Sequence, residues 1–296
     1  MSISNRPVWM GRPSLLTKAA KGFAVAVIVA MMVFPMWVVV ATSLADTEDV
    51  VANGGYVVWP QRWSFTTYER LFSTGMVPRA LAVSLGVTLV GTALSLFVTI
   101  GLAYALSRPQ VFGGRPVLLM VLFTFLFPSG MIPLYLIVKG TGLINTFGAL
   151  FLPGLLSAFN LIVMRGFFQS VPADLIEAAR IDGAGELRVL LRIVLPLSKA
   201  VIAVIGLFYA VGYWNNFFNA ILYLDDPAKY PVATLLRYFL NAGVSVNAAE
   251  SEASAVVAPQ SVQMAVVVLA TIPILVVYPF VQRFFVKGVL TGAVKA

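Results

Sequence analysis

The sequence predicts an all-α membrane protein with six transmembrane helices. Three observations predict this class. First, 60% of its 296 residues are hydrophobic, only 11% are charged, and the mean hydropathy is +0.93, far from the composition of soluble domains. Second, the chain contains six long apolar runs without charge. Third, the basic residues concentrate in alternate connections between these runs, as they do in multi-span membrane proteins.

The six runs set the expected transmembrane helices. Each has roughly the twenty residues that a helix needs to cross about 30 Å of hydrocarbon, and none contains Asp, Glu, Lys or Arg. They cover residues 23–44, 80–106, 117–138, 146–164, 200–224 and 262–282. We therefore expect a cytoplasmic N-terminal segment over 1–22, a membrane domain over 23–286 and a cytoplasmic tail over 287–296. The first run is too long for the core of a signal peptide, so we expect it to be retained as a helix.

The charges predict the orientation. One set of connections, which includes both termini, holds 14 of the 20 basic residues, and the other holds six basic residues and eight of the twelve acids. The basic set belongs on the cytoplasmic side, so we expect both termini in the cytoplasm of a bacterial cell with the chain in the inner membrane. The net charge of +8 then reflects topology and indicates no nucleic-acid partner.

Small residues recur every fourth position in the second predicted span. Gly91, Ser95, Thr99 and Ala103 therefore lie on one helical face, where they allow close approach of another helix. Ordinary packing within the bundle is the expected role of this stripe.

The connection between the fourth and fifth spans, about residues 166–199, is unusually charged and helix-forming. Ser170 is expected to cap a helix that has Pro172 in its first turn and acids at Asp174 and Glu177, near the positive end of the helix dipole. Gly183 is expected to end this helix as the residue after its C-cap.

A second amphipathic helix is expected between this glycine and Pro196. Its apolar face has the i, i+3, i+4, i+7 spacing and consists of Leu187, Leu190, Leu191 and Val194. From the pattern alone, such a helix pair could simply anchor the bundle at the membrane surface.

The spacing within this loop is more specific than its amphipathicity. Glu177, Ala178 and Ala179 are followed after three residues by Gly183, and after nine more by Ile193-x-Leu195-Pro196. This EAA-x3-G-x9-I-x-LP pattern resembles the EAA signature of permease subunits in bacterial ABC importers. The resemblance covers about residues 20–296, and it is strongest to carbohydrate permeases of the maltose-transporter type, in the subgroup that includes aldouronate and alginate importers.

The resemblance implies a type I ABC importer permease and a set of partners. The loop would be a coupling helix that enters a cleft of a cytoplasmic ATPase, with Glu177 making a charged contact, Ala178 and Ala179 allowing close approach, and Gly183 supplying the turn. Further expected partners are a second permease subunit that differs from this one, a periplasmic or lipid-anchored solute-binding protein, and membrane lipid. Ile193, Leu195 and Pro196 complete the coupling signature.

The chain itself is expected to be neither an enzyme nor a cofactor protein. It has no cysteine and no histidine, and it lacks the G-x-x-x-x-G-K-[ST] run that cradles nucleotide phosphates. ATP and Mg²⁺ would be used by the separate ATPase, and no metal site is expected here.

A path for sugars through an apolar bundle needs amides and aromatic rings, which suit hydroxyl groups and ring faces. The run "GYWNNFFN" in the fifth span is the main candidate, although an interfacial aromatic belt would explain it as well. The candidates in full are Tyr135, Asn160, Tyr213, Trp214, Asn215, Asn216 and Asn219, with Gln263 in the sixth span.

Two other classes of function compete with ATP-driven import. An ion-coupled secondary transporter of small polar solutes is the main alternative, although such proteins usually carry ionisable groups at membrane depth, and these spans have none. A membrane scaffold without transport activity is the other. ATP-dependent uptake in proteoliposomes would separate all three.

Overall fold

The computed structural model describes residues 14–109, 111–242 and 258–292. Within these ranges the regular secondary structure is helical, apart from an isolated bridge between Ala45 and Trp63. The extreme ends of the predicted terminal segments, 1–13 and 293–296, lie outside the described residues. Two compact units are distinguished, residues 1–67 with 245–268, and residues 68–244 with 269–296.

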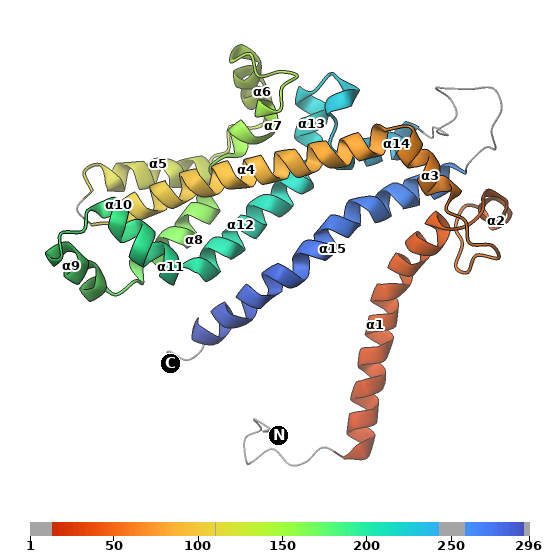
Figure 1. The fold of residues 1–296 in the computed structure, drawn as a ribbon, viewed down its shortest axis with the longest axis horizontal. Helices are drawn as coiled ribbons and strands as arrows, with labels where there is room; N and C mark the ends of the chain where they lie inside the picture. Colours follow the sequence, from red (N-terminus) through yellow and green to blue (C-terminus); the bar gives the residue numbers. More distant parts are fainter. Residues whose placement is uncertain (1–13, 110, 243–257, 293–296) are drawn as a thin grey trace. The chain divides into compact units, whose positions relative to one another are not determined.

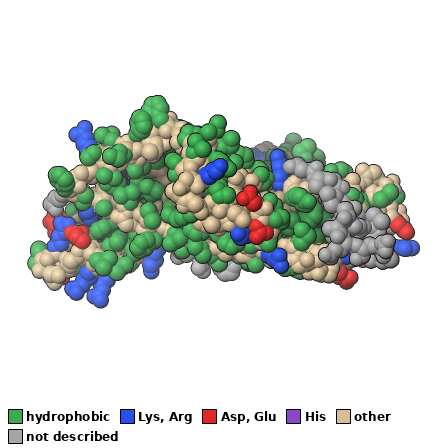
Figure 2. Space-filling model, turned by 90° about the horizontal axis from the view of Figure 1, so that it is seen from above, with side chains coloured by type: hydrophobic (Ala, Val, Ile, Leu, Met, Phe, Trp, Pro, Cys, Tyr) green, Lys and Arg blue, Asp and Glu red, His purple; other side chains and the backbone are tan. Residues whose placement is uncertain are grey.

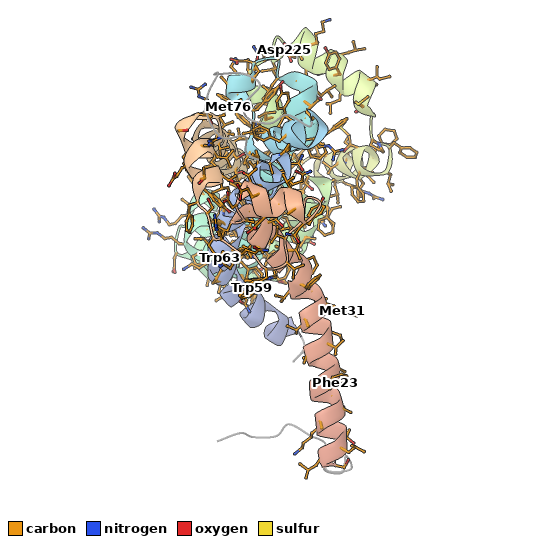
Figure 3. All side chains as sticks on the ribbon, turned by 90° about the vertical axis from the view of Figure 1, so that its right-hand side faces the viewer. Phe23, Met31, Trp59, Trp63, Met76 and Asp225 are labelled. Carbon is orange, nitrogen blue, oxygen red and sulfur yellow. The ribbon has the colours of Figure 1, made fainter. Side chains whose placement is uncertain are left out.

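The helices of the first unit follow from capping and apolar length. Helix α1 (Leu15–Ser43) begins where the Ser14 side chain accepts a hydrogen bond from the Thr17 N–H group. It spans about 44 Å at the usual rise per residue, and Phe23 and Met31 project from its exposed surface (Figure 3). Short helix α2 (Thr47–Ala52) follows, capped by Asp46.

An aromatic cluster closes the loop that follows α1 in this unit. Trp37 of α1 lies 5.7 Å from Trp59 and 6.4 Å from Trp63, measured between ring centroids, and its indole N–H donates to the Val58 carbonyl at 2.8 Å. Figure 3 shows Trp59 and Trp63 close together. The rings tie the loop to the end of α1.

The second unit is built around three helices that lie side by side, α4 (Met76–Ser107), α8 (Ala158–Gln169) and α12 (Lys199–Trp214), as Figure 1 shows. Its other helices are α5 (Gly114–Leu126), α6 (Met131–Gly140), α7 (Gly148–Phe151), η1 (Leu152–Gly154), α9 (Ala173–Ile181), α10 (Glu186–Val189), the π-helical turn η2 (Leu190–Val194), α11 (Leu195–Leu197), α13 (Phe217–Tyr223), η3 (Pro227–Lys229) and α14 (Val232–Ala242). Helix α3 (Thr66–Ser73) starts at the boundary between the units, and α15 (Pro259–Gly292) has residues in both.

Three of the predicted spans are continuous helices and three are interrupted. Helices α1, α4 and α15 are long and apolar enough to cross a membrane, and three bent helix pairs bring the possible number of spans to six within the described residues. The third pair, Glu186–Leu197 with Lys199–Trp214, includes part of the predicted loop, whereas the predicted 200–224 span is interrupted between α12 and α13. The 117–138 segment is not one helix, because the chain bends by 118° between α5 and α6, around Pro128 and Gly130. The φ of 81° at Gly130 ends the regular backbone there. The 146–164 segment bends by 52° after Pro153.

The small-residue stripe of α4 packs against α12. Ser95, Thr99 and Ala103 are fully buried, and a β-carbon at Gly91 would lie 2.9 Å from the Tyr213 ring. Only glycine permits this approach without displacement of the ring. The predicted packing role of the stripe is therefore confirmed, and α12 is the helix that it contacts.

Candidate functional site

A cavity of about 500 Å³ lies beside α12, and its wall contains four of the predicted path residues. These four are Asn160, Tyr213, Asn216 and Asn219. Phe159, Phe208 and Tyr209 add aromatic surface, and Leu150, Gly154, Ser157 and Gly212 complete the lining. The lining therefore combines amides, hydroxyls and ring faces, and it contains no charged side chain.

Hydrogen bonds from α4 hold two tyrosines of this cavity in place. The Tyr213 hydroxyl lies 2.7 Å from Ser95 Oγ, and the Tyr209 hydroxyl lies 2.8 Å from Thr99 Oγ1. The Ser157 N–H group also donates to the Tyr209 hydroxyl at 3.0 Å. The two rings stack with centroids 6.5 Å apart. Fixed hydroxyls and parallel rings give the cavity a rigid wall.

The asparagines of "GYWNNFFN" lie at a break between α12 and α13, and part of their hydrogen-bonding capacity is used locally. The Asn215 side chain donates to the Val211 carbonyl at 3.0 Å, and the Asn216 side chain accepts from the Asn219 N–H group at 3.3 Å as the N-cap of α13. Asn215 is exposed outside the cavity lining. The break, which the apolar pattern did not predict, is what points Asn216 and Asn219 at the cavity.

Three further predicted path residues lie elsewhere. Trp214 is buried and donates its indole N–H to the Ala270 carbonyl at 3.2 Å. Tyr135 of α6 stacks on Tyr223 with ring centroids 6.2 Å apart. Gln263 of α15 is not among the residues that line the cavity. Tyr209, which the sequence reasoning missed, has the same one-turn spacing from Tyr213 as Thr99 has from Ser95, and this matched spacing was the available signal.

The second candidate site is the charged loop, in which α9 starts two residues later than predicted. Ser170 does not cap α9. It ends α8 instead, and its hydroxyl donates to the Phe167 carbonyl at 2.8 Å. Pro172 occupies the N-cap position, where its side chain makes no capping hydrogen bond. The proline ring restricts φ to a value that suits the residue before a helix.

Gly183 ends α9 in the conformation that was expected of it. Its φ is 78°, its N–H group donates to the Arg180 carbonyl at 3.0 Å, and the next N–H group, from Ala184, donates to the Ala179 carbonyl at 2.9 Å. This pair of bonds is the Schellman arrangement, in which a left-handed residue reverses the chain.

The EAA residues divide between outer and inner faces of the loop. Glu177 and Ala178 are exposed, whereas Ala179 packs against the core around buried Ile176. Ile193 and Leu195 pack against the same core, and Pro196 is exposed. Glu177, Ala178, Gly183 and Pro196 are therefore the members of the signature that another protein can reach.

The apolar face predicted for the second helix is wrong in part. Val189 and Val194 are fully buried, five residues apart, while Leu187 and Leu191 are 68% and 55% exposed. The reason is the π-helical turn Leu190–Val194, whose extra residue per turn moves the buried stripe out of α-helical register. The two exposed leucines border a hollow of about 540 Å³ that also contains Arg188 and Arg192.

A charged cluster fastens this loop to the end of α4. The Tyr104 hydroxyl donates to Glu186 Oε2 at 2.5 Å, and the Arg180 guanidinium donates to Glu186 Oε1 at 2.6 Å through Nη2 and at 3.1 Å through Nε. The Tyr104 hydroxyl, and then Arg180, hold the pKa of the Glu186 carboxyl below its ordinary value. Figure 2 shows charged side chains gathered at the end of this unit where α9 and α10 lie.

Comparison with known proteins identifies the family. Residues 82–291 match the model of the binding-protein-dependent transport system inner membrane component. The chain belongs to this family. The permease is 45% identical to the polygalacturonan/rhamnogalacturonan transport system permease YtcP of Bacillus subtilis, over 89% of this chain and 92% of that one. It is 43% identical to LplC of the same organism, over 94% and 97%.

A solved structure agrees with the fold. The permease matches a chain of a bacterial ABC transporter involved in import of the acidic polysaccharide alginate, with a TM-score of 0.83 and 28% identity, over 93% of this chain and 100% of that one. The predicted all-α ABC permease architecture is confirmed, and the family is one of multi-span inner-membrane proteins. An ion-coupled secondary transporter is not favoured by these relationships.

Proposed function

We propose that this permease is one of two membrane subunits of an ATP-driven importer, and that it passes oligosaccharides or polysaccharide fragments delivered by a solute-binding protein. The uncharged cavity suits such a substrate, because amides and hydroxyls pair with sugar hydroxyl groups and aromatic faces pack on pyranose rings. The relatives named for polygalacturonan, rhamnogalacturonan and alginate support the same substrate class.

The observation that carries this proposal is that one helix, α4, contacts both candidate sites. Ser95 and Thr99 bond the cavity tyrosines, and Tyr104, slightly further along the same helix, bonds Glu186 of the loop. A motion of the loop is thereby passed to the cavity wall through one continuous helix. Such a connection is what coupling between a cytoplasmic ATPase and a membrane path requires.

The ATPase would dock on the exposed side of the loop. Glu177 offers a charged contact, and Ala178 permits close approach of the partner's backbone. Three exposed apolar side chains add hydrophobic surface, namely Ile181, Leu187 and Leu191. This arrangement requires the loop, and with it both chain termini, to lie in the cytoplasm, with ATP and Mg²⁺ bound by the ATPase.

A second permease subunit would complete the path. Most of α1 is exposed and apolar, as is one side of α5 through Leu119, Met120 and Phe123. Such surfaces need lipid or a neighbouring subunit. We expect a different chain as the neighbour, in keeping with the resemblance to heterodimeric sugar importers.

Reconstitution tests the proposal. The permease, its ATPase, the second permease and the binding protein are placed in proteoliposomes, and uptake of oligogalacturonides and of neutral oligosaccharides of equal length is measured. We expect uptake that needs ATP and persists when ionophores collapse ion gradients. Uptake that follows an ion gradient without ATP would contradict it.

Asn160→Ala should raise the concentration for half-maximal uptake about tenfold, or about 1.4 kcal/mol, whereas Asn215→Ala, outside the cavity, should not.

The same assay separates acidic from neutral substrates. Because the cavity has no positive charge, carboxylates would be recognised outside it, by arginines and lysines near the outer ends of the helices or by the binding protein. Equal uptake of neutral and acidic oligosaccharides would show that this permease does not select by charge.

A further inference from the structure

A second cavity, of about 530 Å³, lies where the ends of α4 and α8 meet the starts of α5 and α9, and three arginines line it. Arg108 follows α4, Arg115 lies in the first turn of α5, and Arg165 lies near the end of α8. No acidic side chain is among the lining residues. The cavity is distinct from the one beside Tyr213 and belongs entirely to the second unit.

The guanidinium of Arg108 is not fully used by the protein. Its central carbon lies 4.5 Å from the centroid of the Tyr104 ring, on which the cation stacks. Its Nε and Nη2 atoms are buried and have no hydrogen-bond partner among the described residues. A buried guanidinium N–H without a partner is costly, so an acceptor from outside the chain is expected there.

The lining of the cavity holds no carboxylate to balance its arginines, and Glu186, which Arg108 attracts, lies outside the lining. Arg165 donates from Nε to the Leu106 carbonyl at 2.9 Å, a neutral acceptor, and Arg115 is exposed at the rim. Gly114 and Ala173 place the positive ends of α5 and α9 at the same cavity. Three cations and two helix N-termini together favour an anion with several acceptor oxygens, such as a phosphate group.

Most of the remaining wall of this cavity is apolar, and Ser107 and Gln169 are its uncharged polar side chains. Leu106, Leu118, Phe168, Val171 and Ile176 line it beside the arginines, and fully exposed Phe112 stands in the adjoining loop. On α5, Leu119 and Met120 continue this exposed apolar surface along the predicted membrane span. A free inorganic anion would contact the arginines but would gain nothing from the apolar wall. A phospholipid matches both, because its headgroup can contact the arginines and its acyl chains can pack on the apolar side chains.

We propose that this cavity binds the phosphate headgroup of an anionic phospholipid such as phosphatidylglycerol, with the guanidinium groups of Arg108, Arg115 and Arg165 on the phosphate and an acyl chain along α5. Basic pockets at the ends of membrane helices are suited to such lipids. In the proposed orientation, with both termini in the cytoplasm, this cavity lies at the cytoplasmic leaflet, but lipid binding itself does not depend on that orientation. Because Tyr104 lies under Arg108 and bonds Glu186, a bound lipid would stabilise the end of α4 to which the loop is fastened.

Lipid binding to the purified, assembled importer provides the test. The complex in detergent is titrated with phosphatidylglycerol, with phosphatidylcholine and with inorganic phosphate, and bound lipid is counted by native mass spectrometry. We expect a tight phosphatidylglycerol site that phosphatidylcholine does not fill and that millimolar phosphate displaces only weakly. Equal binding of both lipids, or full displacement by phosphate, would overturn the proposal.

Matched variants locate the site. R108Q/R115Q should weaken phosphatidylglycerol binding at least tenfold, and R108K/R115K, which keeps both charges, should retain much of it. R188Q/R192Q removes the same charge from the neighbouring loop, outside this cavity, and should leave binding unchanged. Equal losses in both glutamine variants would mean that the lipid responds to net charge alone, which contradicts a site.

Two further readouts separate lipid binding from misfolding and from contact with the ATPase. Retention of the partner subunits during purification shows that R108Q/R115Q is folded. If that variant loses the ATPase while it binds phosphatidylglycerol normally, then carboxylates of the ATPase occupy the cavity and the lipid proposal is wrong. The assay uses no sugar and no ATP turnover, so failure of the transport proposal and failure of this one give different results.

Discussion

The hydroxyl of Tyr104, in the last turn of α4, donates a hydrogen bond of 2.5 Å to the carboxylate of Glu186 at the first position of α10. The two residues are 82 positions apart in the chain. Arg180 of α9 binds the other oxygen of this carboxylate, so one side chain connects both helices of the loop to α4. This contact supplies the physical link between the loop and the bundle.

Tyr104→Phe removes this link and keeps the aromatic ring. We expect a several-fold fall in sugar transported per ATP hydrolysed, because the loop can then move without α4, and a loss of about 1 kcal/mol or more in stability. The measurement compares ATPase rate and uptake in the same proteoliposomes. Tyr278→Phe, an exposed tyrosine of α15, serves as the control. An unchanged amount of sugar transported per ATP hydrolysed in Tyr104→Phe would rule out the Tyr104–Glu186 contact as the link between the loop and the bundle.

The Glu186 carboxylate predicts a pH dependence. Its pKa is lowered in the folded protein, so its contribution to stability is complete above the ordinary pKa of glutamate and declines as the pH falls through the lowered value. We expect wild type to exceed Glu186→Gln in thermal stability at pH 7, and this difference to shrink as the pH falls below about 4. A difference that is independent of pH would assign the effect to packing.

Gly183 and Gly185 form a matched pair for the turn after α9. A β-carbon meets no atom within 4 Å at either position, but φ is 78° at Gly183 and −71° at Gly185. Gly183→Ala should therefore cost about 1–2 kcal/mol from the left-handed backbone alone, while Gly185→Ala should be nearly neutral. Gly183→Val should weaken ATPase binding further, which co-purification of the ATPase would measure. If Gly183→Val retained the ATPase and transported sugar with normal use of ATP, the turn at Gly183 would have no role in ATPase binding.

Gly91 tests the contact between α4 and α12. Gly91→Ala places a β-carbon 2.9 Å from the Tyr213 ring, so the ring must move and its bond to Ser95 is strained. We expect a loss of about 1–3 kcal/mol and a higher half-saturation concentration for uptake. Gly86→Ala, on the same helix with no atom within 4 Å, is the control. Similar thermal stability and uptake in the two variants would contradict the predicted rigidity of the cavity wall.

Glu177 tests the docking surface for the ATPase. The side chain is exposed and makes none of the hydrogen bonds among Tyr104, Glu186 and Arg180. Only its charge acts on Arg180, so Glu177→Ala should leave the fold intact. We expect weaker retention of the ATPase and reduced uptake, with normal insertion in the membrane. Asp174→Ala, an exposed acid one turn earlier on α9, controls for the loss of charge. Equal retention of the ATPase by both variants would remove Glu177 from the docking surface.

Local physics explains which features were predictable. The length of each apolar run predicts a spanning helix, because backbone groups without hydrogen bonds are excluded from lipid. A residue with no β-carbon is favoured where φ is positive, as at Gly183. The four-residue spacing from Gly91 to Ala103 predicts one helical face by geometry alone. The family signature in the 177–196 loop is likewise a property of residue types and spacing.

The sequence by itself thus determined the membrane class, the stripe, the glycine turn and the family. Only the tertiary structure decided that the 117–138 segment folds back at Pro128, that a π-helical turn exposes Leu187 and Leu191, and that Trp214 packs while Asn216 faces a cavity. It also brought Tyr104 to Glu186 and Tyr209 to Thr99. These outcomes depend on contacts between residues tens of positions apart, and periodicity within one segment contains no information about what the opposite helix presents.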